Sequence, residues 1–484
     1  MRFGYDVEGW AMLAQLHFWL NNEEVRCSEP PGLLVLDYLR KKRRLVGTKE
    51  GCKEGDCGAC TVLVGELQNS TLVYRPVTSC LMPVGELHGK HLVTIEGLNL
   101  PRLNPVQKAI VEEGASQCGF CTPGIVVSLT GYLMQTDQPV TTDGIKRWLS
   151  GHLCRCTGYR SLKATCFHLK EVVGKHTGVK ELVRNGWLPA YFREMPERLR
   201  RIPPPVFRDG RSEEGIVIAG GTDIYVQRGE TLPGARVHIL NGYPRMKGIR
   251  RTGRDLRIGA LTTFEELANH PEVQKFIPEI QQYMFRVASL QIRNRATIGG
   301  NIINASPIAD GVILLLALDA EVVLQKGKRQ RVLPLRQLYR GYKQLDKQPG
   351  EILTEVRLPL SVRGCQIHFE KVSKRRTLDI ASVNSAIRLR CDVAGIIQEA
   401  ALAMGGVAPI PLYLEKTRQF LLGKPCIPAT VEGAIEQAMD EISPISDIRG
   451  SADYKRLLTR QLIIAHFTHL FPDRMQVRDY YAIP

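Results

Sequence analysis

Eight of the thirteen cysteines in this 484-residue chain stand in two groups of four, and their spacing constrains the fold more than any other feature. The first group begins with Cys52, Cys57 and Cys60, which read C-x₄-C-x₂-C, and Cys80 completes it further along the chain. This spacing is typical of plant-type [2Fe–2S] centres. The intervening glycines allow the backbone to wrap a small anionic object with its amides pointing inward. The first group therefore predicts a [2Fe–2S] site rather than packed free cysteines.

The second group contains a C-x-x-C pair and a C-x-C pair. Its members are Cys118, Cys121, Cys154 and Cys156. Each pair precedes a predicted helix, with Thr122 and Thr157 as the expected caps, so the positive helix ends would stabilise an anionic cluster and lower thiol pKa values. Two further helices are expected at 105–115 and 142–151, which predicts a small helical bundle around the site. Zinc is the alternative on spacing alone, but two sets of four ligands favour iron in two clusters.

The basic composition raises a different hypothesis. The formal net charge of +16 is compatible with nucleic acid or another negatively charged partner. The densest basic run, RKKRR at 40–44, follows the apolar segment LLVLDYL and is interpreted as the solvated end of a helix. No zinc-finger or RNA-binding-sheet signature accompanies the charge. A zinc-stabilised nucleic-acid-binding protein is therefore the competing class, and no nucleic-acid partner is expected.

The chain carries no obvious membrane or secretion signal. Its longest apolar stretch, at 311–324, is interrupted by Asp319 and Glu321, so no membrane span and no membrane partner are expected. The first fifteen residues contain acidic side chains and no apolar core after a basic start, which argues against a secretory signal. A cytoplasmic location is the expectation, and in that reducing compartment cysteines serve as ligands more often than in disulfides.

The second half of the chain contains two glycine-rich turns. The segment IVIAGGTD at 216–223 is a β-rich run that ends in two glycines and a threonine, and ATIGGNIINASP at 296–307 repeats the pattern. Such turns can present backbone amides to a phosphate, and two of them could hold a pyrophosphate from two sides. A purely structural turn is the alternative for the first. No G-x-G-x-x-G motif follows a strand, so a Rossmann nucleotide site is not supported.

Taken together, these motifs resemble those of the molybdenum hydroxylase family over about residues 16 to 475. The segments GTKEGCKEGDCGACTVLV, SQCGFCTPGIVVSL and GHLCRCTGYRSL are similar to the two iron–sulfur modules of the family. The segments VIAGGTDIYV, QIRNRATIGGNIINASPIAD, EILTEVRLPL and FEKVSKRRTLDIASVNSA are similar to its flavin-binding module. The resemblance implies that the eight cysteines hold two [2Fe–2S] clusters and that the glycine-rich turns bind FAD.

The resemblance also implies individual FAD contacts. Residues 217–224 match the first pyrophosphate loop, 297–301 match the second, and the later positions match contacts toward the adenosine end and on two strands. The implied contacts are Val217, Ile218, Ala219, Gly220, Gly221, Thr222, Asp223, Ile224, Thr297, Gly299, Gly300, Asn301, Asp310, Leu353 and Lys371. For Lys371 the alternative is an ordinary exposed strand residue.

The expected fold class is multidomain α+β. It combines a β-grasp ferredoxin-like domain, a four-helix bundle, and an α+β FAD domain of the vanillyl-alcohol-oxidase/CO-dehydrogenase flavoprotein type with a C-terminal α+β lobe. The linker would be stiffened by the prolines at 203–205. The expected boundaries are 14–95 for the ferredoxin-like domain, 96–178 for the bundle, 179–208 for the linker, 209–360 for the FAD domain and 361–484 for the C-terminal domain.

The function implied by the resemblance is electron transfer. Electrons would enter from the molybdenum centre of a large partner subunit, pass through the bundle cluster and the ferredoxin-like cluster to FAD, and leave on NAD⁺. Flavin suits this junction because it exchanges one or two electrons. Xanthine dehydrogenase is the expected type, in an (αβ)₂ heterotetramer, with the molybdenum cofactor and the catalytic residues of hydroxylation on the partner only. The alternative is the equivalent subunit of an aldehyde or N-heterocycle dehydrogenase.

Overall fold

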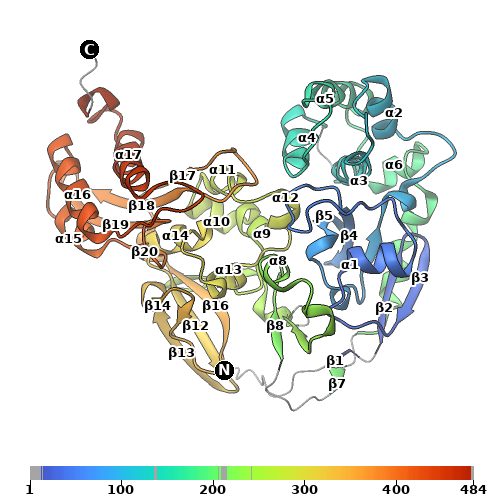
Figure 1. Cartoon of the computed structure of the whole chain (residues 1–484), viewed down its shortest axis with the longest axis horizontal. Helices are drawn as coiled ribbons and strands as arrows, with labels where there is room; N and C mark the ends of the chain where they lie inside the picture. Colours follow the sequence, from blue (N-terminus) through green and yellow to red (C-terminus); the bar gives the residue numbers. More distant parts are fainter. Residues whose placement is uncertain are drawn as a thin grey trace. The chain divides into compact units, whose positions relative to one another are not determined.

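The computed structural model describes residues 12–13, 15–135, 139–204, 207–208, 215–240 and 243–480. The chain forms two compact units (Figure 1). The first unit contains Glu8–Gly242 together with the short segment Ser289–Ala296, and the second contains Tyr243–Ala288 and Thr297–Pro484. The ends of the predicted outer domains, at 14 and 481–484, and the predicted start of the FAD domain, at 209, lie outside the described residues.

The first unit opens with a five-stranded sheet of order β3-β2-β6-β4-β5. The β2–β6 pair is parallel and the other pairs are antiparallel. The short helix α1 (Val35–Asp37) runs into a π-helical turn (Tyr38–Lys42) and contributes Val35 and Leu39 to the core that covers this sheet. This arrangement confirms the predicted β-grasp fold. The strands are β2 (Leu16–Leu20), β3 (Glu23–Cys27), β4 (Thr61–Gln68), β5 (Thr71–Thr78) and β6 (His91–Val93).

Four helices follow and form the predicted bundle. They gather into one group in Figure 1 and share a core that includes Ile125, Leu129, Ile145 and Leu169. The first begins at a capping box, because the side chain of Asn104 accepts from the backbone of Gln107 and the Gln107 side chain accepts in return. The helices are α2 (Pro105–Glu112), α3 (Thr122–Leu133), α4 (Thr142–Leu149) and α5 (Arg160–Val173).

The structure differs from the predicted linker at 179–208. Helices α6 (Val179–Arg184) and α7 (Met195–Arg200) occupy most of this stretch. Phe192, between them, is buried, with its ring centroid 5.6 Å from that of Tyr74 and 5.5 Å from that of His91. Buried apolar side chains therefore fasten this segment onto the first unit. The prolines at 203 and 204 come only after α7, and Pro205 lies outside the described residues.

The first unit ends in a β-α-β element that the sequence places in the FAD domain. Strand β8 (Ile216–Ile218) pairs in parallel with β9 (Val237–Ile239), and α8 (Ile224–Arg228) connects them. Ile218 and Tyr225 share one hydrophobic core with two cysteines of the first group. The compact unit thus extends past the predicted boundary at 209, because this element buries its apolar face against the ferredoxin-like domain. The two cysteines are Cys60 and Cys80.

The second unit contains a five-stranded antiparallel sheet of order β10-β11-β16-β12-β13 and several helices. Thr263 starts α9 with a capping box, in which Glu266 is its partner. The strands are β10 (Ile249–Arg251), β11 (Asp255–Gly259), β12 (Glu321–Lys326), β13 (Arg329–Pro334) and β16 (Ile352–Pro359), and the helices are α9 (Phe264–Asn269), α10 (Pro271–Phe276), α11 (Ile280–Phe285), α13 (Ile298–Asn304) and α14 (Asp310–Ala317).

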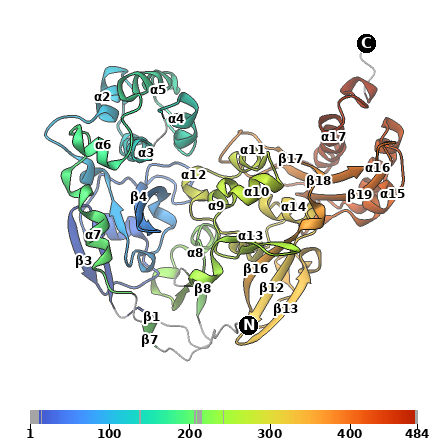
Figure 2. The same ribbon diagram turned by 180° about the vertical axis from the view of Figure 1, so that it is seen from behind.

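The C-terminal lobe is a four-stranded antiparallel sheet packed against helices, as Figure 2 shows from behind. Residues Val383–Leu389 of β18 are buried without alternation, so both faces of the sheet are covered. This confirms the predicted α+β lobe. Its elements are β17 (Gln366–Val372), β18 (Val383–Cys391), β19 (Ile397–Gly405), β20 (Leu412–Tyr413), α15 (Glu415–Leu421), α16 (Pro428–Glu441) and α17 (Ala452–Leu470). Among the described residues, no helix has both the length and the apolar character needed to cross a membrane.

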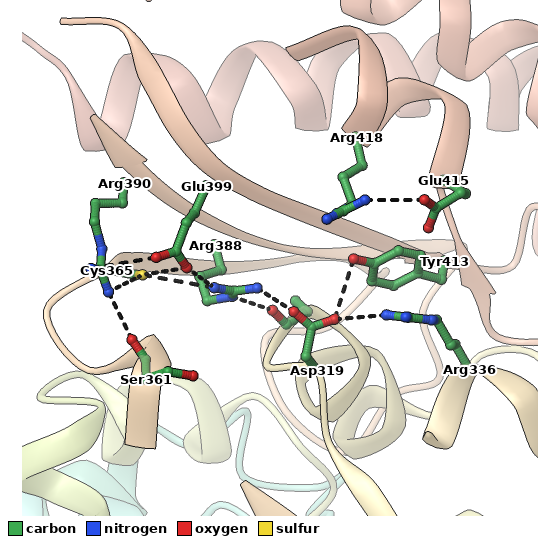
Figure 3. A network of polar contacts seen from close by, with 11 residues as sticks. Asp319, Arg336, Ser361, Cys365, Arg388, Arg390, Glu399, Tyr413, Glu415 and Arg418 are labelled. Atoms are coloured by element: carbon green, nitrogen blue, oxygen red, sulfur yellow. Dashed lines mark hydrogen bonds and ion pairs between the residues drawn. The ribbon is translucent and has the colours of Figure 1, made fainter. Parts of the chain in front are cut away.

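A buried arginine organises one edge of this lobe (Figure 3). The Arg388 side chain is 4% exposed; it pairs with Asp319, lies 2.7 Å from Glu399 Oε2, and donates through Nε to a backbone carbonyl. Arg336 and Tyr413 also reach Asp319, at 3.2 and 3.3 Å. The guanidinium is desolvated but fully occupied by acceptors, which is the condition for burying a charge.

A histidine in the first unit should make stability depend on pH. His91 is fully buried, with Nδ1 2.7 Å from the Tyr74 hydroxyl and Nε2 2.8 Å from the Asn21 carbonyl oxygen. Burial lowers the pKa of His91 to about 3. The unfolded chain binds this proton near pH 6.5 and the folded chain does not, so stability is present above about pH 6.5 and falls below it, by at most about 1.4 kcal/mol per pH unit until about pH 3.

The expected measurement is a comparison of melting temperatures for wild type and His91→Gln between pH 7 and pH 4.5. The wild type should be the more stable at pH 7 and its advantage should shrink on acidification, since glutamine has no proton to gain. A pH-independent difference would show that the protonation of His91 does not contribute.

Candidate functional site

The first cysteine group lies where the ferredoxin-like sheet meets β8 and α8. Cys52, Cys57 and Cys60 lie on the loop before β4, and Cys80 follows β5. The thiols interact in two pairs, Cys52 with Cys57 and Cys60 with Cys80. The backbone amides of Glu54 and Cys57 each donate to Cys52 Sγ at 3.4 Å. The Cys57 thiol and these amides lower the pKa of Cys52 to about 5, against the opposing effect of burial.

The second group pairs in the same way, across the two motifs. Cys118 contacts Cys156, and Cys121 contacts Cys154. Cys118 and Cys156 are exposed, whereas Cys121 and Cys154 are buried. Burial alone would raise the pKa of Cys154, but hydrogen bonds from Thr157, whose hydroxyl lies 3.0 Å from the sulfur, lower it overall. Four thiols from two distant motifs are therefore brought together in two pairs.

The helix starts differ in detail from the prediction. Helix α3 begins at Thr122 with Cys121 as its N-cap residue, one position earlier than expected. Helix α5 begins at Arg160 after Tyr159, which has a left-handed φ of 64°, so Thr157 is not its cap. The Thr157 hydroxyl instead lies 3.0 Å from Cys154 Sγ and accepts from the Tyr159 amide at 3.3 Å.

The donor sets fit two [2Fe–2S] clusters. A two-iron cluster needs two thiolates at each iron, whereas a structural zinc site needs four ligands around one point. Both groups resolve into two pairs of thiols. The amides that donate to Cys52 would stabilise the negative charge of a cluster. The pairing therefore favours iron over zinc.

The first predicted flavin loop follows β8. Val217 and Ile218 end the strand, Ile224 begins α8, and the intervening turn comprises Ala219, Gly220, Gly221, Thr222 and Asp223. The turn packs very closely: a Cβ at Gly220 would lie 2.1 Å from the Arg295 carbonyl oxygen. Gly221 has a φ of +76°, which disfavours other residues, and a Cβ there would lie 3.2 Å from the Leu81 carbonyl oxygen. The turn thus packs against Leu81, the residue that follows Cys80.

An open cavity lies beside the first cysteine group, within the first unit. Its volume is about 960 Å³, and it is lined by Cys52 and Cys80 on one side and by Tyr225 and Gln227 of α8 on the other. The first cysteine group and the helix that follows the predicted flavin loop therefore face a common space.

The second predicted flavin loop lies in the second unit and is the start of a helix rather than an open loop. Thr297 caps α13, with Oγ1 accepting from the Gly300 amide at 3.0 Å. Gly299 stands in the first turn, where its amide donates to the Ala260 carbonyl at 2.8 Å. Within the described ranges, no hydrogen-bond partner reaches the buried side-chain oxygen of Asn301, which is a feature expected where a bound group completes the site.

The structure brings Asp310 and Lys371 together. Lys371 Nζ lies 2.7 Å from Asp310 Oδ2 and donates to the Arg286 carbonyl oxygen at 3.1 Å. The lysine side chain is 2% exposed, so its alternative interpretation as an exposed strand residue is wrong. Asn384 donates to the other oxygen of Asp310, at 2.5 Å. Asn384 could not be predicted, because a polar residue inside a buried strand carries no local signal of its partner.

Leu353 is placed differently from the other predicted contacts. Its side chain is 3% exposed in the sheet core, where it lies opposite Leu324 on the neighbouring strand. Helix α13 packs against β16, the strand that carries Leu353. The Leu353 side chain is therefore buried in the core of the sheet.

Four family descriptions match consecutive parts of the chain. A 2Fe-2S iron-sulfur cluster binding domain matches residues 18–85, and a [2Fe-2S] binding domain matches 94–166. An FAD binding domain in molybdopterin dehydrogenase matches 206–361, and a CO dehydrogenase flavoprotein C-terminal domain matches 368–470. These matches identify both cluster modules and the flavin module of the chain.

Among similar proteins, aldehyde oxidase 1 of Rattus norvegicus is 30% identical over 94% of this chain and 39% of its own length. Xanthine dehydrogenase of Emericella nidulans is 29% identical over 87% of this chain and 36% of its own length. The chain thus spans about two fifths of the length of these relatives.

Solved structures of two such enzymes also resemble about half of this chain. Carbon monoxide dehydrogenase from Hydrogenophaga pseudoflava has a TM-score of 0.50 and 28% identity, over 54% of this chain and 90% of the matched chain. Quinoline 2-oxidoreductase from Pseudomonas putida 86 has a TM-score of 0.50 and 25% identity, over 55% of this chain and 92% of the matched chain. With two [2Fe–2S] domains, an FAD domain and these relatives, the chain belongs to the molybdenum hydroxylase family, of which it carries the iron–sulfur and FAD part.

Proposed function

We propose that this chain is the electron-transfer part of a xanthine dehydrogenase, which receives electrons from a molybdenum-binding partner subunit and delivers them to NAD⁺. The observation that carries the proposal is the shared core of the first cysteine group and the first predicted flavin loop. Cys60, Cys80 and Ile218 lie in one hydrophobic cluster, and Leu81 supports the Gly221 turn. The first cysteine group and the first predicted flavin loop therefore share a core within one compact unit.

Different residues of the chain are proposed to bind the clusters, to stabilise their charge and to bind the flavin. The eight cysteines supply thiolates, while amides and the Thr157 hydroxyl stabilise their charge. The loops at 217–224 and 297–301, with Asp310, Lys371 and the backbone near Leu353, are proposed to bind FAD. The clusters would carry single electrons and the flavin would exchange one or two.

The partner and the acceptor are proposed from the relatives. Xanthine dehydrogenases and aldehyde oxidases that match this chain are more than twice its length, so the chain corresponds to only one part of them. We propose that a molybdenum-binding subunit supplies the remainder, in an (αβ)₂ heterotetramer in the cytoplasm. NAD⁺ is proposed as the acceptor from the resemblance of the sequence motifs to the molybdenum hydroxylase family.

A second substrate class has equal support. Aldehyde oxidase 1 is about as similar to this chain as the xanthine dehydrogenases, at 30% against 29% identity, and a chain of quinoline 2-oxidoreductase resembles 55% of this chain in fold. We propose to distinguish the classes with the complex of this chain and its molybdenum-binding partner. Xanthine-dependent reduction of NAD⁺ supports the first assignment, whereas turnover of an aldehyde or of quinoline alone assigns the second.

The purified chain provides the first test. It should contain iron and flavin, oxidise NADH with an artificial dye as acceptor, and show no turnover of xanthine until the partner is added. Zinc without iron would contradict the cluster assignment. Xanthine turnover by the isolated chain, free of molybdenum, would contradict the division of labour between the subunits.

A further inference from the structure

One short segment of the flavin-binding sequence belongs to the iron–sulfur side of the molecule. Ser289–Ala296 forms part of the first unit, while the residues on both sides of it belong to the second unit. It contains helix α12 (Leu290–Arg293), which is capped by the Ser289 hydroxyl at 3.3 Å from the Ile292 amide. The chain then continues into Thr297, the first residue of the second predicted flavin loop. We call Ser289–Ala296 the strap.

One end of the strap is anchored beside the first cluster. The Arg295 guanidinium binds both oxygens of Glu86, at 2.8 and 2.9 Å, with the two side chains only 5% and 4% exposed. The same guanidinium donates to the Gly220 carbonyl at 2.6 Å and to the Leu81 carbonyl at 3.4 Å. A planar guanidinium can satisfy several acceptors in fixed directions, which a lysine cannot do. Arg295 therefore holds the first flavin loop and the residue after Cys80 in one arrangement.

The other end of the strap is anchored beside the second cluster. Gln291 is fully buried, and its amide nitrogen donates to His152 Nε2 at 3.0 Å and to the Ser128 hydroxyl at 3.3 Å. His152 stands two residues before Cys154, and Ser128 lies on α3, which begins after Cys121. The next residue after His152 donates its amide to the Cys57 carbonyl at 3.1 Å, which joins the two cysteine loops. Gln291 thus supports the loop that carries two bundle ligands.

The middle of the strap contacts the ferredoxin-like domain directly. Asn294 donates to the Pro76 carbonyl of β5 at 2.9 Å. A Cβ at Gly55, within the first cysteine loop, would lie 2.7 Å from the Ile292 side chain. The strap therefore touches both cysteine loops and the first flavin loop with groups that are buried and directional.

We propose that the strap positions the two clusters and the flavin for electron transfer, with Arg295 and Gln291 as the positioning residues. The inference rests on the proposed function. Reactive groups need their supporting contacts to be locked, because small displacements of the reacting centres have large effects on rate. A bidentate buried ion pair at one end and a buried amide at the other provide such a lock.

The test uses the full chain with Arg295→Lys, Glu86→Gln and Gln291→Leu. Iron content should stay at the wild-type level. Arg295→Lys and Glu86→Gln should alter the paramagnetic spectrum of the ferredoxin-like centre and slow the transfer of electrons between cluster and flavin about tenfold or more, as measured by rapid-mixing absorbance. Gln291→Leu should alter the spectrum of the bundle centre.

The matched control is Arg388→Lys in the C-terminal lobe. Arg388 is an equally buried arginine with two carboxylate partners (Figure 3), but it belongs to the second unit. This variant should lower the melting temperature and leave both spectra and the transfer rate unchanged. Wild-type spectra and rates in Arg295→Lys and Glu86→Gln, or equal changes in Arg388→Lys, would contradict the proposed positioning role of the strap. Absence of iron and flavin from the wild type would instead contradict the proposed function.

Discussion

Cys154→Ser is expected to remove one of two [2Fe–2S] signals from the reduced chain and to leave the other unchanged. Cys154 is buried, contacts Cys121, and receives hydrogen bonds from Thr157, so serine would replace a stabilised thiolate by a poor iron ligand. The two donor sets differ in fold and in exposure, and the two centres should therefore have distinct spectra. The measurement is electron paramagnetic resonance of the reduced protein together with iron analysis, in which iron falls by about half.

The chain offers a matched cysteine for this experiment. Cys166 lies on α5 in the same bundle, is 2% exposed, and donates to the Leu162 carbonyl at 3.1 Å without belonging to either set. Cys166→Ser should keep both signals. Cys118→Ser should reproduce the loss seen in Cys154→Ser, whereas Cys60→Ser should remove the other signal. Loss of both signals in every variant, or zinc in place of iron in the bundle, would contradict the assignment of two independent [2Fe–2S] sites.

Gly221→Val is expected to release flavin while iron remains bound. Gly221 has a φ of +76°, and its ideal Cβ would lie 3.0 Å from the Tyr225 ring and 3.2 Å from the Leu81 carbonyl oxygen. A β-branched residue in this conformation costs about 1–3 kcal/mol, so the loop would move and flavin affinity should fall roughly tenfold to a hundredfold. The measurement is flavin absorbance per chain after gel filtration, with iron determined in the same sample.

Gly234→Val is the control for the flavin experiment. Gly234 follows α8 in the same unit, but no atom of the described residues beyond its chain neighbours lies within 4 Å of its ideal Cβ, and its φ is not left-handed. This variant should retain flavin and iron. Full flavin occupancy in Gly221→Val would show that the loop at 217–224 does not bind the pyrophosphate.

Local spacing allowed the cofactors and much of the fold to be predicted. The interval between Cys52, Cys57 and Cys60 reflects the size of the object that the loop must wrap, which is a local property of the chain. The helices after Cys121 and Cys156 were predictable from Pro123 and from apolar periodicity, which act within a few residues, whereas the expected threonine caps were wrong. The predicted linker was wrong for 179–202, where two helices form and buried side chains such as Phe192 join the core. The prolines that follow at 203–205 had suggested an extended segment.

The sequence by itself determined which modules the chain contains and predicted which residues bind iron, because ligand chemistry and hydrophobic periodicity are encoded locally. Only the tertiary structure decided how Cys118 pairs with Cys156, how Lys371 neutralises Asp310, and how Arg295 meets Glu86 from 209 residues away. Ion pairs and buried amides of this kind have no period and no fixed separation along the chain. They form when packed elements bring desolvated groups together, and an unpaired group would then be costly.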